Sequence, residues 1–268
     1  QPAMSHFLSN LEDRLGVKLF RRVRGKYIPT YEGERYLFYA KKIMYLESQM
    51  ENEFTEIRNA GYGQIRLALP TLRSAYILPD LIFEYGKLYP NVKFILREAH
   101  SGLLEKLLLN GEVDFAILNA PIKSRETTSV LIRNDEVLLA VPPFHPFAGY
   151  GKHREGQYLP TIDIALFKHD KFIFQYPDQR TRQVADHILE QAKIEPNILL
   201  ETRSIETALK MVSKGMGLCF VPETYVKGAS LEVSPVYFSL NSPNSILELS
   251  LAYLKNIYLP KYFQDFIE

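Results

Sequence analysis

The sequence predicts an α/β protein in three parts: a small N-terminal head, one long helix, and a larger body of two α/β lobes. Three observations support this prediction. Basic side chains concentrate near one end, where residues 14–42 hold nine Lys or Arg against two Glu. Apolar residues then recur at helical spacing over residues 31–59. Residues 64–268 alternate short apolar strands with helices, which is the pattern of βαβ units on a mostly parallel sheet.

The composition excludes several classes of protein. Of the 268 residues, 46% are hydrophobic and 24% are charged, which is ordinary for a globular chain and unlike a disordered or fibrous one. The single cysteine, Cys219, rules out a disulfide framework and a cysteine-built zinc site, and it fits a reducing cytoplasm. The longest uncharged stretches span 15 residues, at 137–151 and 233–247, whereas a membrane helix needs about 20. No signal peptide opens the chain, so we expect a cytoplasmic protein with no membrane partner.

A helix with one apolar and one polar face is predicted over residues 2–15. Pro2 suits a first helical position, and Gly16 suits a helix end. The apolar face carries Met4, Phe7, Leu8, Leu11 and Leu15, and the opposite face carries Gln1, Ser5, His6, Ser9 and Asn10. Short hydrogen-bonding side chains of this kind can read base edges in the major groove of DNA. A helix-turn-helix needs an earlier helix for its core, so the head is expected to be truncated at its N-terminus.

A basic segment follows this helix. We expect Gly25 to form a turn together with Arg21, Arg22, Arg24 and Lys26, followed by an extended segment at residues 27–30. This pattern is typical of a β-hairpin wing whose basic tip faces DNA phosphates. The alternative is a solvated surface on which basic residues cluster by chance.

A long helix is predicted over residues 31–59, with Thr30 as its cap and Gly33 early in it. Residues at alternating spacings of four and three form a seam: Tyr36, Ala40, Ile43, Glu47, Met50, Phe54 and Ile57. A seam of this length, broken only by Glu47, favours pairing between the helices of two copies. The alternative is a single helix that packs on its own domain. Gly61 and Gly63 end the helix and mark a hinge.

The body contains two alternations of strands and helices. The expected strands span residues 64–69, 92–97, 113–118, 136–143, 172–175, 197–201, 218–221 and 247–253. The expected helices span residues 75–88, 103–109, 179–192, 205–213 and 260–266. Since the pattern restarts near residue 138, we expect two lobes.

Lobe I is expected to contain residues 64–137 and 239–268, and lobe II residues 138–238. Strands near 138–141 and 233–238 would cross between the lobes. This is the architecture of a periplasmic-type binding protein, with a ligand cleft between the lobes.

In such sheets, ligands bind beyond the carboxyl ends of strands, where helix N-termini present free N–H groups. The residues expected to bind the ligand are Thr71, Leu72, Arg73, Ser101, Gly102, Asn119, Gln175, Thr202, Arg203 and Ser204. Hydroxyl groups beside helix N-termini favour a small anion such as a carboxylate, and Arg73 and Arg203 are able to pair with it. The alternative for each arginine is an exposed charge, and the alternative for Thr71, Ser101 and Thr202 is a helix N-cap.

Several motifs resemble those of the LysR-type transcriptional regulators. They are Gln1-Pro2-Ala3-x-Ser5, Leu11-Glu12-x-x-Leu15-Gly16-Val17-x-Leu19-Phe20-x-Arg22 and Ile28-x-Thr30-x-x-Gly33. The remainder of the chain also fits, so the resemblance covers essentially all 268 residues. This sequence departs from the family pattern in two ways. The family's DNA-binding head begins further upstream, and His6 stands where the family frequently has Arg.

The resemblance implies a winged helix-turn-helix over residues 1–30, a linker and dimerisation helix over 31–60, and an effector-binding domain over 64–268. The implied partners are double-stranded promoter DNA, a small anionic effector, and further copies of the chain in a homodimer or homotetramer. In this sequence Gln1, Pro2, Ser5 and His6 would approach the bases. The DNA backbone would be held by Arg21, Arg22, Arg24 and Lys26.

Catalysis is not expected. The six histidines show no metal-ligand spacing, and the sequence contains no Gly-x-Ser-x-Gly, no Ser-x-x-Lys and no phosphate-binding glycine loop with a lysine. No cofactor is expected either. Two rival classes share the two-lobed fold. A solute-binding protein would lack the basic wing and the long helix, and an enzyme would need catalytic residues in the cleft, none of which is visible.

Overall fold

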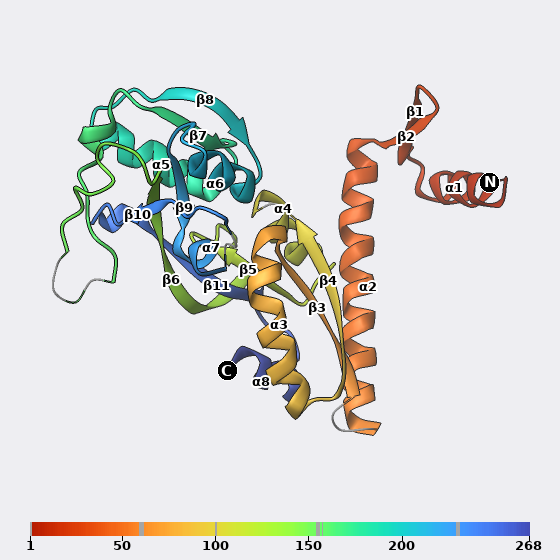
Figure 1. Ribbon diagram of the computed structural model, residues 1–268. Coiled ribbons are helices and arrows are strands. Elements are labelled where there is room, and N and C mark those ends of the chain that lie inside the picture. Colours follow the sequence, from red (N-terminus) through yellow and green to blue (C-terminus); the bar gives the residue numbers. More distant parts are fainter. Residues whose placement is uncertain (1, 59–61, 100, 154–155, 157, 229–230) are drawn as a thin grey trace.

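The computed structural model describes residues 2–58, 62–99, 101–153, 156, 158–228 and 231–268 (Figure 1). Within these ranges, the side chains of Pro2, Ala3, Glu56, Ile57, Leu72, Ser101 and Lys227 are not described. The head lies beyond one end of the long helix, and the body lies alongside the rest of that helix (Figure 1).

The head consists of α1 (Pro2–Leu15) and a hairpin of β1 (Phe20–Val23) and β2 (Lys26–Pro29). Helix α1 has the predicted bounds, and its buried Glu12 fastens the hairpin to it. The Glu12 carboxylate accepts hydrogen bonds from the backbone N–H groups of Leu19 and Phe20, at 2.8 and 3.1 Å, and pairs with Lys18 at 2.8 Å. The Lys18 ammonium and these N–H groups hold the pKa of Glu12 below its usual range.

The turn of the hairpin is shorter than predicted. Arg21 and Arg22 belong to β1, where they pair with Ile28 and Tyr27, and Lys26 begins β2. Only Arg24 and Gly25 form the turn, and both have positive φ, at 49° and 79°. Two-residue turns of this kind match the twist of the flanking strands. The basic residues are therefore spread along the hairpin and are not gathered at its tip.

The long helix is α2 (Tyr31–Arg58), whose 28 residues correspond to about 42 Å. The predicted cap is confirmed, because the Thr30 hydroxyl accepts a hydrogen bond from the Gly33 N–H at 3.0 Å. One face of α2 packs on the body through Tyr45 and Gln49, which are both buried. From the predicted seam Tyr36, Ile43, Met50 and Phe54 are exposed. The helix thus packs on its own domain and still leaves most of the described seam open.

The first half of the body is built on the strands β3 (Tyr62–Pro70), β4 (Asn91–Ala99), β5 (Phe115–Asn119) and β11 (Ile246–Leu254) together with the start of β6 (Thr127–Val141). β3 pairs in parallel with β4 and β5, and β11 runs antiparallel between β5 and β6. Helices α3 (Thr71–Leu88) and α8 (Lys261–Ile267) pack on one face of this sheet, and α4 (Ser101–Leu109) packs on the other. We refer to this half as lobe I.

The second half, lobe II, is built around the end of β6, which pairs with β9 (Cys219–Pro222) and β10 (Val236–Phe238). β7 (Lys171–Gln175) pairs in parallel with β8 (Asn197–Thr202). The helices of this lobe are α5 (Arg180–Gln191), α6 (Ile205–Ser213) and α7 (Glu223–Gly228), and two short 3-10 helices lie at Ile164–Phe167 and Pro243–Ser245.

Three expectations about the body need correction. The strand expected from residue 136 begins at Thr127, and its first part was missed because polar residues interrupt the apolar pattern near Asp135. The strand expected from residue 113 begins at Phe115, and Asp114 just before it pairs with Arg66 of β3 at 2.7 Å. β10 pairs within lobe II and does not cross, so the chain returns to lobe I at the start of β11, opposite Glu136.

Gly33 is required by the close approach of α2 to the head. An added Cβ would lie 1.9 Å from the Leu19 carbonyl oxygen, whereas a Cβ on Gly86, in α3, would meet nothing within 4 Å. Gly33→Ala is expected to destabilise the protein by about 1–3 kcal/mol, the usual cost of overpacking. Gly86→Ala, the matched control, is expected to stabilise it by about 0.5–1 kcal/mol. Urea unfolding followed by circular dichroism measures both, and an unfolding midpoint for Gly33→Ala at or above the wild-type value would contradict the observed packing.

Candidate functional site

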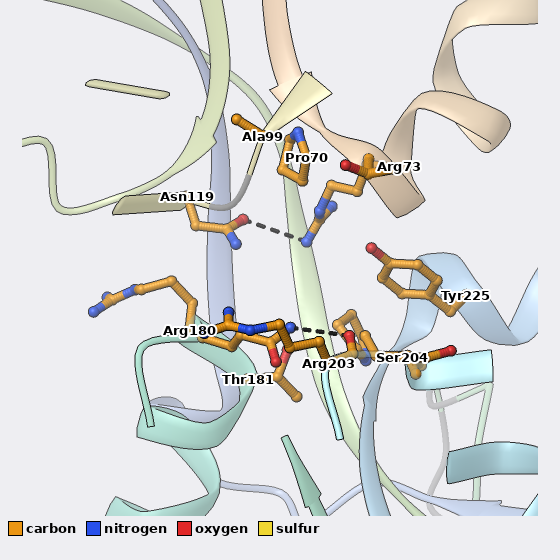
Figure 2. Close-up of a pocket in the computed structure, with 13 residues that line it drawn as sticks. Pro70, Arg73, Ala99, Asn119, Arg180, Thr181, Arg203, Ser204 and Tyr225 are labelled. Atoms are coloured by element: carbon orange, nitrogen blue, oxygen red, sulfur yellow. Dashed lines mark hydrogen bonds between the residues drawn. The ribbon is translucent and has the colours of Figure 1, made fainter. Parts of the chain in front are cut away.

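A cavity of about 330 Å³ lies between the two lobes (Figure 2). Lobe I contributes the ends of β3 and β5 and the start of α3, and lobe II contributes the starts of α5, α6 and α7. The lining residues are Pro70, Thr71, Arg73, Ala99, Asn119, Gln179, Arg180, Thr181, Arg203, Ser204, Ile205, Pro222 and Tyr225. Figure 2 shows Arg73 and Asn119 on one side of the cavity, with Arg180, Thr181, Arg203 and Ser204 on the other. Its size falls in the range of small-molecule sites.

The N-termini of three helices meet at this cavity. Thr71 begins α3, Arg180 begins α5 and Ile205 begins α6, and all three residues line it. The N-cap residues of α3 and α5, Pro70 and Gln179, make no side-chain capping hydrogen bond, whereas the Ser204 hydroxyl caps α6 by accepting a hydrogen bond from the Thr207 N–H at 3.1 Å. Free N–H groups and helix dipoles favour a negative charge at this place.

Arg73 is buried at the boundary of the lobes and already has an acidic partner. Its Nη2 lies 2.9 Å from the Asp135 carboxylate and donates to Asn119 Oδ1 at 3.3 Å, and the side chain is only 3% exposed. Asp135 also accepts a hydrogen bond from the backbone N–H of Thr224, at the start of α7, at 3.0 Å. Arg73 Nη1 is buried and makes no hydrogen bond with the described residues. The pair thus links α3, β6 and α7, and one arginine nitrogen remains available.

Arg180 spans the two lobes. Its Nη2 donates to the Ala120 carbonyl oxygen of lobe I at 2.8 Å, and its Nη1 donates to Gln183 Oε1 at 2.6 Å. The Nε atom is buried and has no hydrogen-bond partner among the described residues, and no acidic side chain of that part of the chain forms an ion pair with this arginine. By contrast, the exposed Arg203 pairs with Asp178 at 3.0 Å and lies over the Tyr176 ring. Arg180 is therefore the lining cation whose charge is not balanced by a described acid.

The structure brings together some of the predicted ligand-binding residues and not others. Thr71, Arg73, Asn119, Arg203 and Ser204 line the cavity. Three other predicted residues, Gly102, Gln175 and Thr202, do not line it. The Leu72 and Ser101 side chains lie outside the described part of the chain.

Each of the three residues that do not line the cavity has a local reason. Gln175 points into the interior, where it is fully buried and both side-chain polar atoms lack a partner among the described residues. The Thr202 hydroxyl accepts a hydrogen bond from the Ser204 N–H, which turns it toward its own loop. Gly102 is exposed one residue into α4.

The sequence analysis did not predict Arg180, Thr181 and Tyr225 among the residues of the cavity. The first residues of each helix that follows a strand are candidates for such a site, and this criterion finds Arg180 and Thr181. They open the helix that follows β7, as Thr71 opens the helix after β3. Tyr225 could not be found in this way, because the short helix α7 was not predicted. Burial raises the pKa of Tyr225 to about 12, so its hydroxyl stays neutral beside the cavity.

The head presents a separate charged surface. Ser5, His6, Arg21, Arg22, Arg24 and Lys26 are all exposed. The four Arg and Lys side chains of the hairpin form no ion pair with the described residues. The His6 ring lies 3.1 Å from the Asn10 amide nitrogen. Gln1 lies outside the described residues, as does the side chain of Pro2.

The remaining chemistry-bearing groups do not form a second reactive centre in the described residues. Cys219 is buried in lobe II, and burial raises the pKa of its thiol to about 12. No group of three or more His, Cys, Asp or Glu in that part of the chain is arranged to hold a metal ion. Of the helices described, none has the length and apolar character needed to span a membrane.

A two-lobed binding domain joined through a long helix to a basic, hairpin-bearing head defines a ligand-responsive regulator that binds nucleic acid. Comparison with known proteins agrees with this class. The family model of the LysR substrate binding domain matches residues 59–268, and the model of bacterial regulatory helix-turn-helix proteins of the lysR family matches residues 1–34. The chain belongs to the LysR family of transcriptional regulators. The helix-turn-helix match also decides against a solute-binding protein.

Individual relatives are distant but extend over most of the chain. The uncharacterized HTH-type transcriptional regulator YcgK of Bacillus subtilis (strain 168) is 28% identical over 279 residues, which cover 100% of this chain and 85% of the relative. A full-length OxyR variant from Pseudomonas aeruginosa has a TM-score of 0.73 at 20% identity, covering 99% of this chain and 85% of that one. The effector-binding domain of QuiR in complex with shikimate has a TM-score of 0.64 at 21% identity, covering 77% of this chain and 95% of that one.

The Arg73–Asp135 pair should be important for stability. Asp135→Asn leaves the buried Arg73 charge without a carboxylate, and breaking one side of a buried pair typically costs about 3–5 kcal/mol. Asp178→Asn removes the exposed partner of Arg203 and is expected to cost less than about 1 kcal/mol. The free energy of unfolding from urea titration measures both. Equal losses for the two variants would show that burial does not distinguish these pairs.

Proposed function

We propose that the cavity between the lobes binds a small organic anion that controls the DNA binding of this regulator. The observation that carries the proposal is Arg180, a cavity-lining arginine without an acidic partner among the described residues, beside three helix N-termini. An anion in this position would offer acceptors to Arg180 Nε and Arg73 Nη1, two buried nitrogens that the described residues leave without hydrogen bonds. The complex of the similar QuiR domain with shikimate, a carboxylic acid, supports this ligand class.

In our proposal, the ligand acts on the arrangement of the lobes. Its contacts would come from α3 on lobe I and from α5 and α6 on lobe II, so it would favour arrangements in which those helix ends lie close together. The chain is continuous from lobe I through α2 to the head. A changed lobe arrangement would therefore alter how the heads of an oligomer are spaced on DNA.

We propose for the other parts of the chain the roles that the sequence predicts. We assign residues 1–30 to DNA binding, 31–60 to linking and dimerisation, and 64–268 to effector binding. In our proposal lobe I comprises residues 64–137 and, from the start of β11, 246–268 in place of the expected 239–268, and lobe II comprises the residues between them. Ile43, Met50 and Phe54 are more than half exposed on α2, and a second copy of this helix would cover them. The protein would work in the cytoplasm as a homodimer or homotetramer, without catalysing a reaction.

Ligand binding is tested by a thermal-shift screen of the chain against small carboxylates, including shikimate. A ligand at a hundred times its dissociation constant adds about 2.7 kcal/mol of stability. Arg180→Gln is expected to weaken binding of any hit at least about tenfold, because it removes a charge-assisted hydrogen bond. Lys210→Gln, on the exposed side of α6, is the matched control and should leave the dissociation constant unchanged. Undiminished binding by Arg180→Gln would remove this arginine from the site.

DNA binding is tested by the salt dependence of affinity for duplex DNA. Each phosphate contact adds about 0.9 to the slope of log affinity against log salt concentration. Arg24→Ala should lower the slope by about this amount and weaken binding to all sequences alike. Lys168→Ala, an exposed lysine in lobe II, serves as the control. An unchanged slope for Arg24→Ala would exclude a phosphate contact by the hairpin turn.

A further inference from the structure

A second cavity, of about 410 Å³, lies between α2 and lobe I, away from the cleft between the lobes. Helix α2 forms one wall with Lys42, Tyr45 and Leu46. The opposite wall comes from three separate parts of lobe I: the end of α4, the segment before β6, and the segment that follows β11. None of its residues lines the first cavity.

The α2 wall is held against lobe I by polar contacts on both sides of the cavity. Lys41 pairs with Glu112 at 2.9 Å, and Gln49 Nε2 donates to Asp114 Oδ1 at 3.3 Å. Between these contacts the buried Tyr45 ring stacks on the Arg66 guanidinium, which is itself paired with the buried Asp114 at 2.7 Å. The cavity therefore exists only when α2 is docked on lobe I.

The cavity carries an excess of positive charge. Its lining contains the cations Lys42, Arg125 and Lys255 and a single acid, Glu126. Glu126 is already paired with Lys42 at 3.1 Å. Neither Arg125 nor Lys255 forms an ion pair with the described residues, and the Lys255 ammonium donates only to the Arg125 carbonyl oxygen, at 3.1 Å. Two cations at one opening thus lack an anion.

The rest of the lining is mostly apolar. Leu46 of α2 faces Leu109, Leu254 and Ile257 of lobe I across the same cavity. Tyr45 adds its ring and a buried hydroxyl that has no hydrogen-bond partner among the described residues. An apolar interior beside unpaired cations suits a ligand with a carboxylate and an apolar body, and it does not suit a fully hydrated inorganic ion.

We propose that this cavity is a second ligand site, which takes an aromatic or branched aliphatic carboxylate between the Arg125 and Lys255 cations and the apolar wall of α2. Because the ligand contacts α2 and lobe I together, it binds the docked helix and not the released one. By linkage it stabilises the docked arrangement, and with it the position of the head relative to the body. This inference is independent of the site between the lobes.

The site is tested on the full chain by photolabelling with 4-azidobenzoate, followed by peptide mapping. We expect adducts in the peptides that contain residues 42–46, 109–111 and 254–257, and unlabelled benzoate should compete with them. Lys255→Glu and Arg125→Glu, both at exposed positions, should each reduce this labelling at least about tenfold, since each replaces an attractive charge by a repulsive one. Lys93→Glu, at an exposed position of β4 outside the cavity, is the charge-matched control and should label as the wild type does.

Arg180→Gln separates the two sites. Labelling next to α2 should persist in this variant, while any labelling between the lobes falls. Hydrogen exchange in residues 41–49 should also slow when benzoate is added, because the ligand holds α2 in place. Three results would each overturn the proposal: no adducts next to α2, adducts that Lys255→Glu leaves unchanged, or adducts next to α2 that disappear with Arg180→Gln.

Discussion

The buried pair of Arg73 and Asp135 is the interaction on which the geometry of the cleft depends. Asp135 lies on β6 just before that strand passes from lobe I to lobe II, and Arg73 reaches it from the first turn of α3. The same carboxylate accepts the N–H that opens α7. Because two charges removed from water require each other, α3, β6 and α7 cannot shift independently without leaving one of them unpaired. The position at which the lobes meet is thereby fixed.

Around this pair, some polar side chains of the cleft already have a partner for their charge or hydrogen bond, and others do not. Arg73 has its carboxylate, Arg203 has Asp178, and Ser204 is occupied with capping α6. Among the described residues Arg180 has neutral partners only, and one of them is a carbonyl oxygen of the opposite lobe. Because Arg180 holds the lobes together and has no counterion among the described residues, the charge of a ligand bound there would be linked to the arrangement of the lobes. This physical argument underlies the proposed control by a small anion.

The contact between α2 and lobe I also depends on a charge pair, which lies away from the cleft on β3 and β5. Partly buried Arg66 on β3 and buried Asp114 just before β5 form a pair beneath Tyr45 and Gln49, while the far ends of β3 and β5 border the cleft. The helix that carries the head therefore rests on the two strands whose other ends border the cleft. As a consequence, one face of α2 packs on lobe I, and another face, which contains Ile43, Met50 and Phe54, is left exposed.

The sequence alone determined the local elements, because helical spacing, strand alternation and turn residues are short-range signals. It located α1, α2 with its Thr30 cap, and most strands of the body, and it pointed to Thr71, Arg73, Asn119, Arg203 and Ser204 as residues near one cavity. Only the tertiary structure decided which charges are already paired, since Asp135 lies 62 positions from Arg73 in the chain and nothing local joins them. It also decided that Gln175 turns inward, that Arg180 meets the opposite lobe, and that α2 packs on its own domain. These are contacts between distant segments, and their energies depend on burial, which a sequence pattern does not specify.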